Sequence, residues 1–272
     1  MTSHDVVSVL RKQLGERRIG HAGTLDPDAT GVLLVGVGYV TRLLTFLSGL
    51  DKTYTAQIVL GSATSTLDSS GKVTATHDMS SITLEEVLRV VAENFVGEIK
   101  QVPPMVSALK VDGVRLHELA RQGVEVERAA RDLTIHSFKV LGMPEPCVVD
   151  VEVHCSSGTY IRSLADDLGR ALGGSAHLRN LRRISVGSFL QSECSHLEDA
   201  VVHAPITAVR TMSRVVASDE MKALIKNGRE LEKFDSPAPW VLVDASNSVL
   251  AIYVQSATGR AKPSVVMANA VS

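Results

Sequence analysis

The chain has 272 residues, enough for one large domain or for a large domain followed by a small one. Hydrophobic residues make up 44% and aromatic residues 4%, which excludes a disordered or fibrous chain and argues against a base-stacking face like that of RNA-recognition motifs. The 28 basic and 30 acidic residues leave a net charge of −2, so any contact with nucleic acid has to come from local basic patches.

Helices and strands alternate irregularly in the first half of the chain. Thr2 or Ser3 can cap a first helix, and Thr83 can cap another, with Glu86 at the capping-box position. Residues 62–81 are rich in Ser, Thr, Asp and Gly, which predicts a long surface loop. The other predicted elements are a first helix continuing to Leu14, a glycine-punctuated loop over 20–31, a buried strand over 32–37, a short helix over 41–47, a strand over 54–60 and a helix after Thr83 with Val87, Leu88 and Val91 on one face.

The second half combines longer strands with one clear helix. Strands are predicted near 133–141 and 147–155, and a helix over 160–172 ends at a glycine pair. Near Ser213 the chain changes character, and a short helix over 219–226 precedes three β-rich runs at 240–244, 249–254 and 264–267. The elements show no regular βαβ period, so we expect an α+β fold with domains over 1–212 and 213–272.

The densest cluster of unusual residues is the loop over 20–31, with three glycines and one proline. Irregular loops between regular elements often carry function. A phosphate-binding loop is excluded because the segment has no lysine and lacks that motif's spacing, and a metal site would need more ligands than His21, Asp26 and Asp28. Asp26 therefore either serves chemistry or closes an Asx turn by bonding to backbone amides.

Cationic side chains stand out in two further places. Arg162 falls in the first turn of the predicted helix, where the helix dipole disfavours a cation, so it needs an anionic partner or belongs to a structural salt bridge. After the glycine pair, His177, Arg179, Arg182 and Arg183 form a basic cluster. Such runs usually form a solvated face, and composition alone leaves their function open.

The cysteines and the N-terminus bear on the cellular compartment. The three cysteines are odd in number and show no C-x-x-C spacing, which argues against a disulfide framework and a cysteine-based zinc site. No apolar run is long enough to span a bilayer, and the first residues do not resemble a signal peptide. We expect a protein of a reducing compartment, most simply the cytoplasm.

Five motifs follow one another along the first two thirds of the chain. They are Gly20-His21-Ala22-Gly23-Thr24-Leu25-Asp26-Pro27; Lys52-Thr53-Tyr54-Thr55-Ala56 leading to Leu60-Gly61; Pro103-Pro104-Met105-Val106-Ser107-Ala108-Leu109-Lys110 with Gly113-Val114-Arg115; Ser156-Ser157-Gly158-Thr159-Tyr160-Ile161-Arg162-Ser163-Leu164; and His177-Leu178-Arg179-Asn180-Leu181-Arg182-Arg183. In this order they resemble the motifs of the TruB family of bacterial tRNA pseudouridine synthases. The resemblance runs from Met1 to about Phe189 and, more weakly, through the C-terminal appendage.

The resemblance implies a fold, a reaction and a partner. The fold is a pseudouridine synthase catalytic domain with a central mixed, mainly antiparallel sheet, followed by a small β-rich PUA-like RNA-binding domain. The family has a short strand and a Lys-Pro pair before the first residues of this chain, so we expect that N-terminal strand to be missing. The implied reaction converts the T-loop uridine at tRNA position 55 to pseudouridine. We expect the T-arm stem-loop of tRNA as partner, no metal, no organic cofactor, no membrane contact and a monomer.

Pseudouridine formation breaks the N1–C1′ bond, turns the uracil and joins C5 to C1′. One group has to capture or stabilise an electrophilic fragment, and a base has to remove the C5 proton. With the resemblance, we expect Asp26 to be the first group and Arg162 to pair with its carboxylate. We expect Tyr54 to stack on the flipped uracil, and its hydroxyl could serve the C5 deprotonation. Whether Asp26 adds to the base, attacks the ribose or abstracts a sugar proton is left open.

Further residues are assigned to substrate binding. Tyr160 would line the same pocket, unless it is an ordinary core aromatic, and Leu181 would close the site over the base. His21 either fills space in the rearranged RNA loop or holds the glycine loop through a backbone hydrogen bond. The RNA phosphates are expected to contact Arg179, Arg182 and Arg183.

Two other functions stay open. A non-catalytic tRNA-binding or folding module would not require Asp26, Tyr54 and Arg162 together, so the presence of this set argues against it. A guide-RNA-dependent synthase of the dyskerin type is disfavoured by the short C-terminal appendage and by the absence of a lysine-rich tail.

Overall fold

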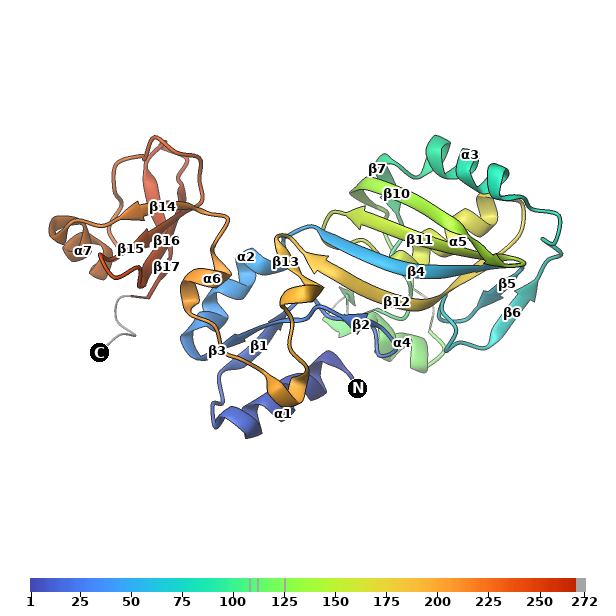
Figure 1. The fold of residues 1–272 in the computed structure, drawn as a ribbon, viewed down its shortest axis with the longest axis horizontal. Coiled ribbons are helices and arrows are strands. Elements are labelled where there is room, and N and C mark those ends of the chain that lie inside the picture. Colours follow the sequence, from blue (N-terminus) through green and yellow to red (C-terminus); the bar gives the residue numbers. More distant parts are fainter. Residues whose placement is uncertain (108, 112, 125, 268–272) are drawn as a thin grey trace. The chain divides into compact units, whose positions relative to one another are not determined.

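A seven-stranded sheet organises one of the two compact units of the chain (Figure 1). The computed structural model describes residues 1–107, 109–111, 113–124 and 126–267, so Ala108 of the third motif lies outside the described residues. Six strands follow the order β13-β12-β4-β11-β10-β7 with antiparallel neighbours, and β2 pairs with β12 in parallel. Their bounds are β2 Thr30–Gly31, β4 Lys52–Leu60, β7 Gly97–Gln101, β10 Arg131–Glu145, β11 Val148–Cys155, β12 Ala176–Val186 and β13 Phe189–Leu190. The sheet is mixed and mainly antiparallel, which confirms the expected α+β class.

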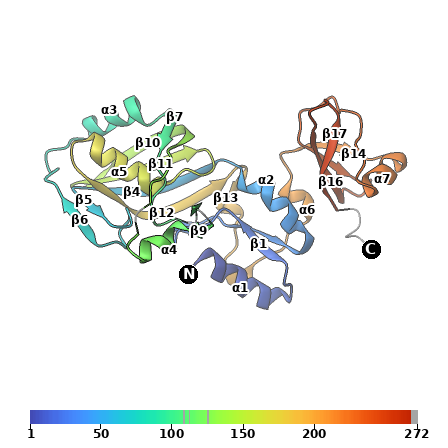
Figure 2. The same ribbon diagram turned by 180° about the vertical axis from the view of Figure 1, so that it is seen from behind.

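Two helices, α3 (Leu84–Asn94) and α5 (Ile161–Ala171), pack against the hydrophobic side of this sheet (Figure 2). Every second residue of β4 is buried, as expected for a strand with one face on a core. The helices contribute Val87, Val90, Val91, Ile161, Leu164, Ala165 and Leu168 to the core. The predicted place of Leu88 in this core is wrong. Its side chain is 46% exposed, because the buried stripe of α3 passes through the three valines instead.

Local capping chemistry sets the start of two helices. In α1 (Ser3–Leu14), the Thr2 hydroxyl accepts a hydrogen bond from Asp5 N, and the Asp5 carboxylate accepts one from Thr2 N at 2.7 Å. Thr83 and Glu86 form the same reciprocal pair at the start of α3. Both capping boxes satisfy backbone N–H groups that have no partner inside the helix, so these two helix starts are determined locally.

Two predicted loops contain strands. The segment over 62–81 holds a hairpin of β5 (Ser62–Thr64) and β6 (Val73–Thr76), which its polar composition concealed. The predicted loop over 20–31 begins inside β1 (Ile19–Ala22), which pairs with β3 (Leu34–Val37), and it ends in β2. The sequence also gave no indication of β7 or of the long strand β12. In each case pairing with a distant strand outweighs a weak local pattern.

The other compact unit consists of residues 1–24, 33–48 and 195–272. It contains α1, β1, β3, the 3-10 helix η1 (Gly38–Leu43), α2 (Leu44–Ser48), η3 (Leu197–Asp199) and α6 (Pro205–Ala208). A four-stranded sheet in the order β14-β15-β16-β17 carries α7 (Asp219–Lys226), and its strands are β14 Ser213–Val216, β15 Trp240–Val243, β16 Val249–Gln255 and β17 Ala261–Val266. This β-rich end of the chain agrees with the predicted appendage. The domain boundary after residue 212 and the PUA-like character stay predictions.

The remaining elements are short. They are β8 (Lys110–Val111), β9 (Val114–Arg115), α4 (Leu116–Arg121) and the 3-10 helix η2 (Gln191–Glu193). Within the described residues, no helix combines the length and apolar character needed to cross a membrane.

Candidate active site

A two-point ion pair joins the loop after β1 to the start of α5. Arg162, only 4% exposed, donates from Nε to Asp26 Oδ2 and from Nη2 to Asp26 Oδ1, both at 2.8 Å. This parallel geometry is the strong arrangement of guanidinium and carboxylate. The structure thus confirms the expected contact and supplies the anionic partner that a cation in a first helical turn needs.

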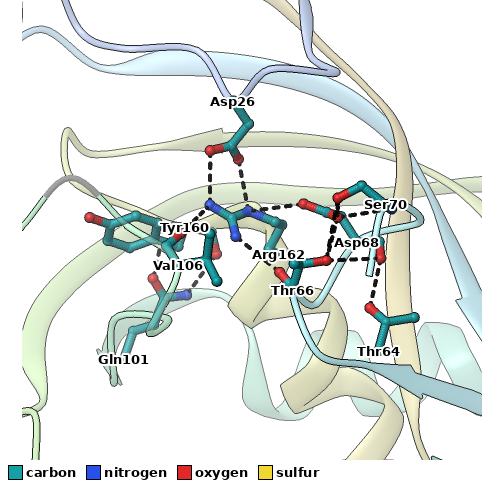
Figure 3. Close-up of polar contacts among 9 residues, drawn as sticks. All are labelled: Asp26, Thr64, Thr66, Asp68, Ser70, Gln101, Val106, Tyr160 and Arg162. Carbon is teal, nitrogen blue, oxygen red and sulfur yellow. Dashed lines mark hydrogen bonds and ion pairs between the residues drawn. The ribbon is translucent and has the colours of Figure 1, made fainter. Parts of the chain in front are cut away.

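Three further groups surround the Arg162 guanidinium (Figure 3). Nη1 donates to the main-chain oxygen of Thr66 at 2.9 Å, and Nη2 donates to that of Val106 at 3.0 Å. Asp68 Oδ2 lies 3.6 Å from Nε. Three chain segments therefore meet at the Arg162 side chain, and a guanidinium held from these directions has a fixed orientation toward Asp26.

Asp68 is a member of this cluster that the sequence did not reveal. Its carboxylate accepts hydrogen bonds from the Thr66 hydroxyl at 2.6 Å and from Ser70 N at 3.1 Å, while the Thr64 hydroxyl donates to its main-chain oxygen at 2.6 Å. In the sequence it lies within a polar segment predicted to be surface loop, where one aspartate among serines and threonines carries no distinguishing signal.

Asp26 itself has its carboxylate turned toward Arg162 rather than into its own turn. Both carboxylate oxygens accept from the guanidinium, and the turn after it is closed by a main-chain bond from Ala29 N to Asp26 O at 3.0 Å. The side chain is 35% exposed. An exposed carboxylate edge next to a buried cation is available to a reactant, which favours the chemical interpretation of Asp26 over the Asx turn.

The ion pair lines a pocket together with residues of β12 and the loop that carries Asp68. The lining residues are Asp26, Asp28, Ala29, Asp68, Ser69, Arg162, Leu178, Arg179, Asn180 and Leu181. Four predicted site residues are in this lining: the two members of the ion pair, the apolar Leu181 and Arg179. An apolar wall beside a charged pair excludes water and strengthens its electrostatic interactions.

A bulge in β12 brings Leu181 to this pocket. Arg179 is paired with Gln57 and Arg182 with Thr55, so two residues, Asn180 and Leu181, stand opposite a single residue of β4. Asn180 has a φ of 54°, the left-handed conformation that asparagine tolerates better than most residues.

The Gln57 side chain holds this bulge. Its Oε1 accepts from Arg179 Nε and Asn180 Nδ2, both at 2.8 Å, and its Nε2 donates to Asp150 Oδ1 at 2.8 Å. One carboxamide thus ties three neighbouring strands together beside the pocket. Gln57 was not predicted as a site residue, because a glutamine in an alternating strand looks like any outward polar position.

Tyr54 lies on the buried side of β4, with 8% of its surface exposed, and it does not line the pocket. Burial raises the pKa of its hydroxyl, while the neighbouring Arg183 guanidinium opposes that shift through its charge and a hydrogen bond. The charge of Asp26 adds a smaller upward effect on the Tyr54 pKa, so the two side chains lie within electrostatic reach. The hydroxyl is therefore protonated at neutral pH.

The expected contact between Arg183 and RNA phosphate is wrong. Arg183 is fully buried, and its Nε donates to the main-chain oxygen of Val32 at 2.7 Å. A Cβ on Gly31 would lie 2.1 Å from the Arg183 main-chain oxygen, so only glycine allows this close approach of β2 to β12. RNA has no access to the guanidinium here; it faces Tyr54 instead.

Arg179 and Arg182 are partly exposed and have protein partners. Arg179 Nη2 forms an ion pair with Glu145 at 3.0 Å, and Arg182 donates to the hydroxyl of Thr30 at 3.0 Å and to Gln191 Oε1 at 2.8 Å. Exposed ion pairs contribute only about 0–1 kcal/mol, so Arg179 can exchange its partner for a phosphate at little cost. Phosphate contacts by these two residues stay predictions.

The two remaining predicted residues have well-defined positions. Tyr160 precedes α5 and is half-buried; Gln101 accepts from its N–H at 2.8 Å and donates to its oxygen at 3.1 Å. His21 belongs to the other compact unit, on β1 opposite Val35, rather than in a loop. Their roles toward RNA stay predictions.

Comparison with known proteins adds the family. Residues 11–161 match the family model described as TruB family pseudouridylate synthase (N terminal domain). The chain belongs to the TruB family. Residues 162–220 match the model described as tRNA pseudouridylate synthase B C-terminal domain. Membership in the TruB family confirms the resemblance inferred from the five motifs.

Curated relatives within the TruB family match nearly the whole chain. A tRNA pseudouridine synthase B of Arthrobacter sp. (strain FB24) is 42% identical, covering 98% of this chain and 93% of the relative. Proteins of the same name from Rhodococcus jostii (strain RHA1) and Bacillus cereus (strain ATCC 14579) are 44% and 41% identical. They cover 98% and 99% of this chain and 90% and 94% of their own lengths.

Solved structures share the fold. One is described as an H/ACA RNP bound to a substrate RNA containing 2′-deoxyuridine, with a TM-score of 0.70, 21% identity, and coverage of 98% of this chain and 81% of that one. Another is a Cbf5-Nop10-Gar1 complex, with a TM-score of 0.71, 24% identity, and coverage of 97% and 80%. At this level of identity the likeness concerns the fold alone, and it agrees with the expected pseudouridine synthase architecture.

Proposed function

We propose that the protein is a cytoplasmic enzyme that isomerises the T-loop uridine at tRNA position 55 to pseudouridine, without a metal or organic cofactor. The observation that carries the proposal is the Asp26–Arg162 pair, held in two-point geometry in the wall of a pocket of a TruB-family chain. The names of the curated relatives support tRNA as the substrate.

In this proposal Asp26 carries the central chemical step. When the N1–C1′ bond breaks, electron density leaves with the uracil, and the ribose carbon becomes electrophilic. A carboxylate can capture or stabilise such a fragment, as carboxylates do at the anomeric carbon in glycosidases. Arg162 fixes the carboxylate's direction through its two bonds, while Thr66, Val106 and Asp68 fix Arg162. The position of the Asp26 carboxylate is compatible with three routes: attack on the base, attack on the ribose and abstraction of a sugar proton.

Tyr54 is proposed to receive the flipped uracil and to assist at C5. Flipping a base costs a few kcal/mol, and stacking on an aromatic ring returns about 1–3 kcal/mol. After C5 joins C1′, the proton on C5 has to leave and N1 has to gain one. Burial keeps the Tyr54 hydroxyl protonated, so it would accept the C5 proton only after giving its own proton toward N1, and the adjacent Arg183 cation would stabilise the transient phenolate.

The other predicted residues complete the proposed site. Leu181 forms the apolar wall over the base, since it lines the pocket from the β12 bulge. Tyr160 is proposed as a further wall, held in place by Gln101. For His21, filling space in the rearranged RNA loop and supporting its own chain segment are both compatible with a position on β1.

The decisive experiment incubates the pure full-length chain with an unmodified T-arm stem-loop and no other RNA or protein, and measures pseudouridine at the T-loop uridine. We expect conversion at that uridine and at no other. Binding without conversion would indicate a tRNA-binding or folding module, and conversion only after addition of a guide RNA would indicate a dyskerin-type enzyme. Either result would overturn the proposal.

A further inference from the structure

Two histidines and an aspartate gather on the polar side of the central sheet, outside the pocket. His136 Nε2 lies 3.1 Å from Asp51 Oδ2, and the rings of His136 and His154 have centroids 4.7 Å apart. One potential ligand atom from each residue lies within 4.8 Å of the other two. The side chains are partly exposed, at 36% for His136 and 45% for Asp51, so an ion in solution can reach them.

His136 and His154 lie side by side on neighbouring strands, at a β-bulge in β10. Ile135 pairs with Cys155 and Ser137 with His154, so His136 is an extra residue inserted into β10. The buried residues on either side, Ile135 and Phe138, keep their places in the core, and the additional residue turns outward next to His154. In the bulge both His136 and Ser137 stand opposite His154, so His136 keeps the outward position beside it while Phe138 returns to the core.

The third residue is positioned by its own backbone. Asp51 immediately precedes β4, and its main-chain oxygen accepts a hydrogen bond from Gly187 N at 2.7 Å. The next residue, Lys52, pairs with Cys155, the neighbour of His154. The Asp51 carboxylate therefore reaches the bulge of β10 from the start of β4, on the other side of β11.

We propose that Asp51, His136 and His154 form a binding site for a divalent first-row transition ion, of which zinc is the natural probe. Neutral imidazole nitrogen and carboxylate oxygen are ordinary zinc ligands, and three protein ligands leave at least one position for water. With metal–ligand bonds of about 2.0–2.2 Å, ligand atoms around a tetrahedral ion lie roughly 3.3 Å apart. The distance between Asp51 Oδ2 and His136 Nε2 already agrees with this value within a few tenths of an ångström. A small rotation of the partly exposed His154 ring would bring its nitrogen to the same distance from the other two ligand atoms.

An ordinary ion pair does not account for the whole cluster. A salt bridge would explain the contact of His136 with Asp51, but it gives no role to the second imidazole, whose ring centroid lies 4.7 Å from that of His136. The next cross-strand pair on this face, Lys139 with Glu152 at 2.7 Å, shows what a simple salt bridge between β10 and β11 looks like. Two imidazole rings and one carboxylate within mutual reach instead match the donor types that zinc sites use.

The test is a zinc titration of the full chain by calorimetry, with melting temperatures to confirm that each variant is folded. We expect one zinc per chain. His136→Ala, His154→Ala and Asp51→Asn should each weaken binding by about tenfold or more, because each removes one of three protein ligands. Glu152→Gln, on the same face, and Cys194→Ser, which removes the exposed thiol, should leave the affinity unchanged.

Each contrary result has a definite meaning. Zinc affinity that survives both histidine variants, or that disappears only with Cys194→Ser, would overturn the proposal, as would the absence of stoichiometric binding to the unaltered chain. The site shares no residue with the pocket, so conversion of the T-arm stem-loop should be the same with and without zinc or a chelator. The two proposals can therefore fail independently.

Discussion

At the scale of single residues, the site depends on a buried cation in an unfavourable place. Arg162 lies in the first turn of α5, where the helix dipole repels positive charge, and its side chain is almost entirely removed from water. Two carboxylates and two main-chain oxygens offset that cost, and the shortest contacts are with Asp26. The arrangement holds Asp26 in one direction, and the charge on Asp26 is the property that the chemistry requires.

Asp26→Asn tests that requirement. The amide keeps the size of the side chain but removes the negative charge, so the RNA should bind with near-normal affinity and form no detectable pseudouridine. We also expect a loss of stability of about 1–3 kcal/mol, because a buried guanidinium loses its charged partner. Tm, tRNA affinity and single-turnover product formation should be measured on one preparation.

Asp28→Asn is the matched control. Asp28 lies in the same loop and lines the same pocket, but its side chain is exposed and is not in the ion pair. Its replacement should leave turnover within a few-fold of the unaltered protein, roughly the range of surface substitutions. If a folded Asp26→Asn variant retained a tenth of the normal single-turnover rate, Asp26 would not carry the central chemical step.

At the scale of secondary-structure elements, β12 departs from regular geometry where it borders the pocket. Its bulge presents Leu181, and the Gln57 carboxamide holds the two preceding residues in place. Asp150 in turn holds Gln57 from β11. A pocket wall built on a bulge needs such support, because the inserted residue has no regular partner in the neighbouring strand.

Gln57→Leu should therefore reduce kcat more than it raises KM. Losing the carboxamide frees the bulge, and a displacement of about 1 Å near a reacting group costs up to roughly a hundredfold in rate. Single-turnover kinetics at saturating stem-loop measure this, with Glu152→Gln as a control on the same face.

A paired substitution distinguishes this positioning role from a general loss of stability. Gln57→Glu keeps the acceptor for Arg179 and Asn180 but sets two carboxylates against each other at Asp150, so it should also slow turnover. Combining it with Asp150→Asn restores a donor–acceptor pair and should recover most of the rate. Unchanged kcat in Gln57→Leu, or no recovery in the double variant, would contradict the role of Gln57.

The helix that carries Arg162 also contains an unfavourable charge. Burial, and then the neighbouring Asp166, raise the pKa of Asp167 above its ordinary value. The folded state thus holds a proton on Asp167 more tightly than the unfolded state does, so the ionised carboxylate destabilises the fold at neutral pH.

Asp167→Asn should accordingly raise Tm at pH 7. The gain should be full above the folded pKa, should shrink as the pH falls through it, and should be gone below 3.8, where both states are protonated. Asp132→Asn, at an 85% exposed position, serves as the control and should show no such pH-dependent gain. Thermal melts of both variants and the unaltered protein between pH 3 and pH 8 test this prediction. A Tm difference that does not depend on pH would contradict the destabilising role of ionised Asp167.

At the scale of the whole molecule, RNA binding has to be achieved by a chain with a net charge of −2. No long-range attraction toward a polyanion follows from that value, so local clusters must supply the phosphate contacts. Of the three predicted arginines, Arg183 is buried, which leaves Arg179 and Arg182 as the reachable members. Both are held close to the pocket by β12.

Arg179→Gln and Arg182→Gln should each weaken binding of all tRNAs to a similar degree. Each replacement should lower the slope of log affinity against log salt by about 1, the value for one phosphate contact. Arg89→Gln, in an exposed ion pair on α3, is the control. A salt slope equal to that of the unaltered protein would remove the substituted residue from the RNA interface.

Much of this protein was determined by local sequence. Capping residues determined where α3 begins, and the alternation of apolar and polar residues predicted strands β4 and β11. A stripe of apolar residues at helical spacing predicted α5. Each of these signals depends only on neighbours a few residues away. The five motifs in their order were also sufficient to predict the family. The pairing of Asp26 with Arg162 followed from that resemblance, because the local context of each residue left its role open.

The tertiary structure alone decided what depends on residues far apart in the chain. Arg183 looked like a surface cation but is covered by β2, Asp68 looked like part of a loop but joins Arg162, and Leu181 reaches the pocket through a bulge that Gln57 holds. The site of Asp51, His136 and His154 likewise exists only once three strands are aligned. Burial and strand register are collective properties, and a side chain's local sequence does not contain them.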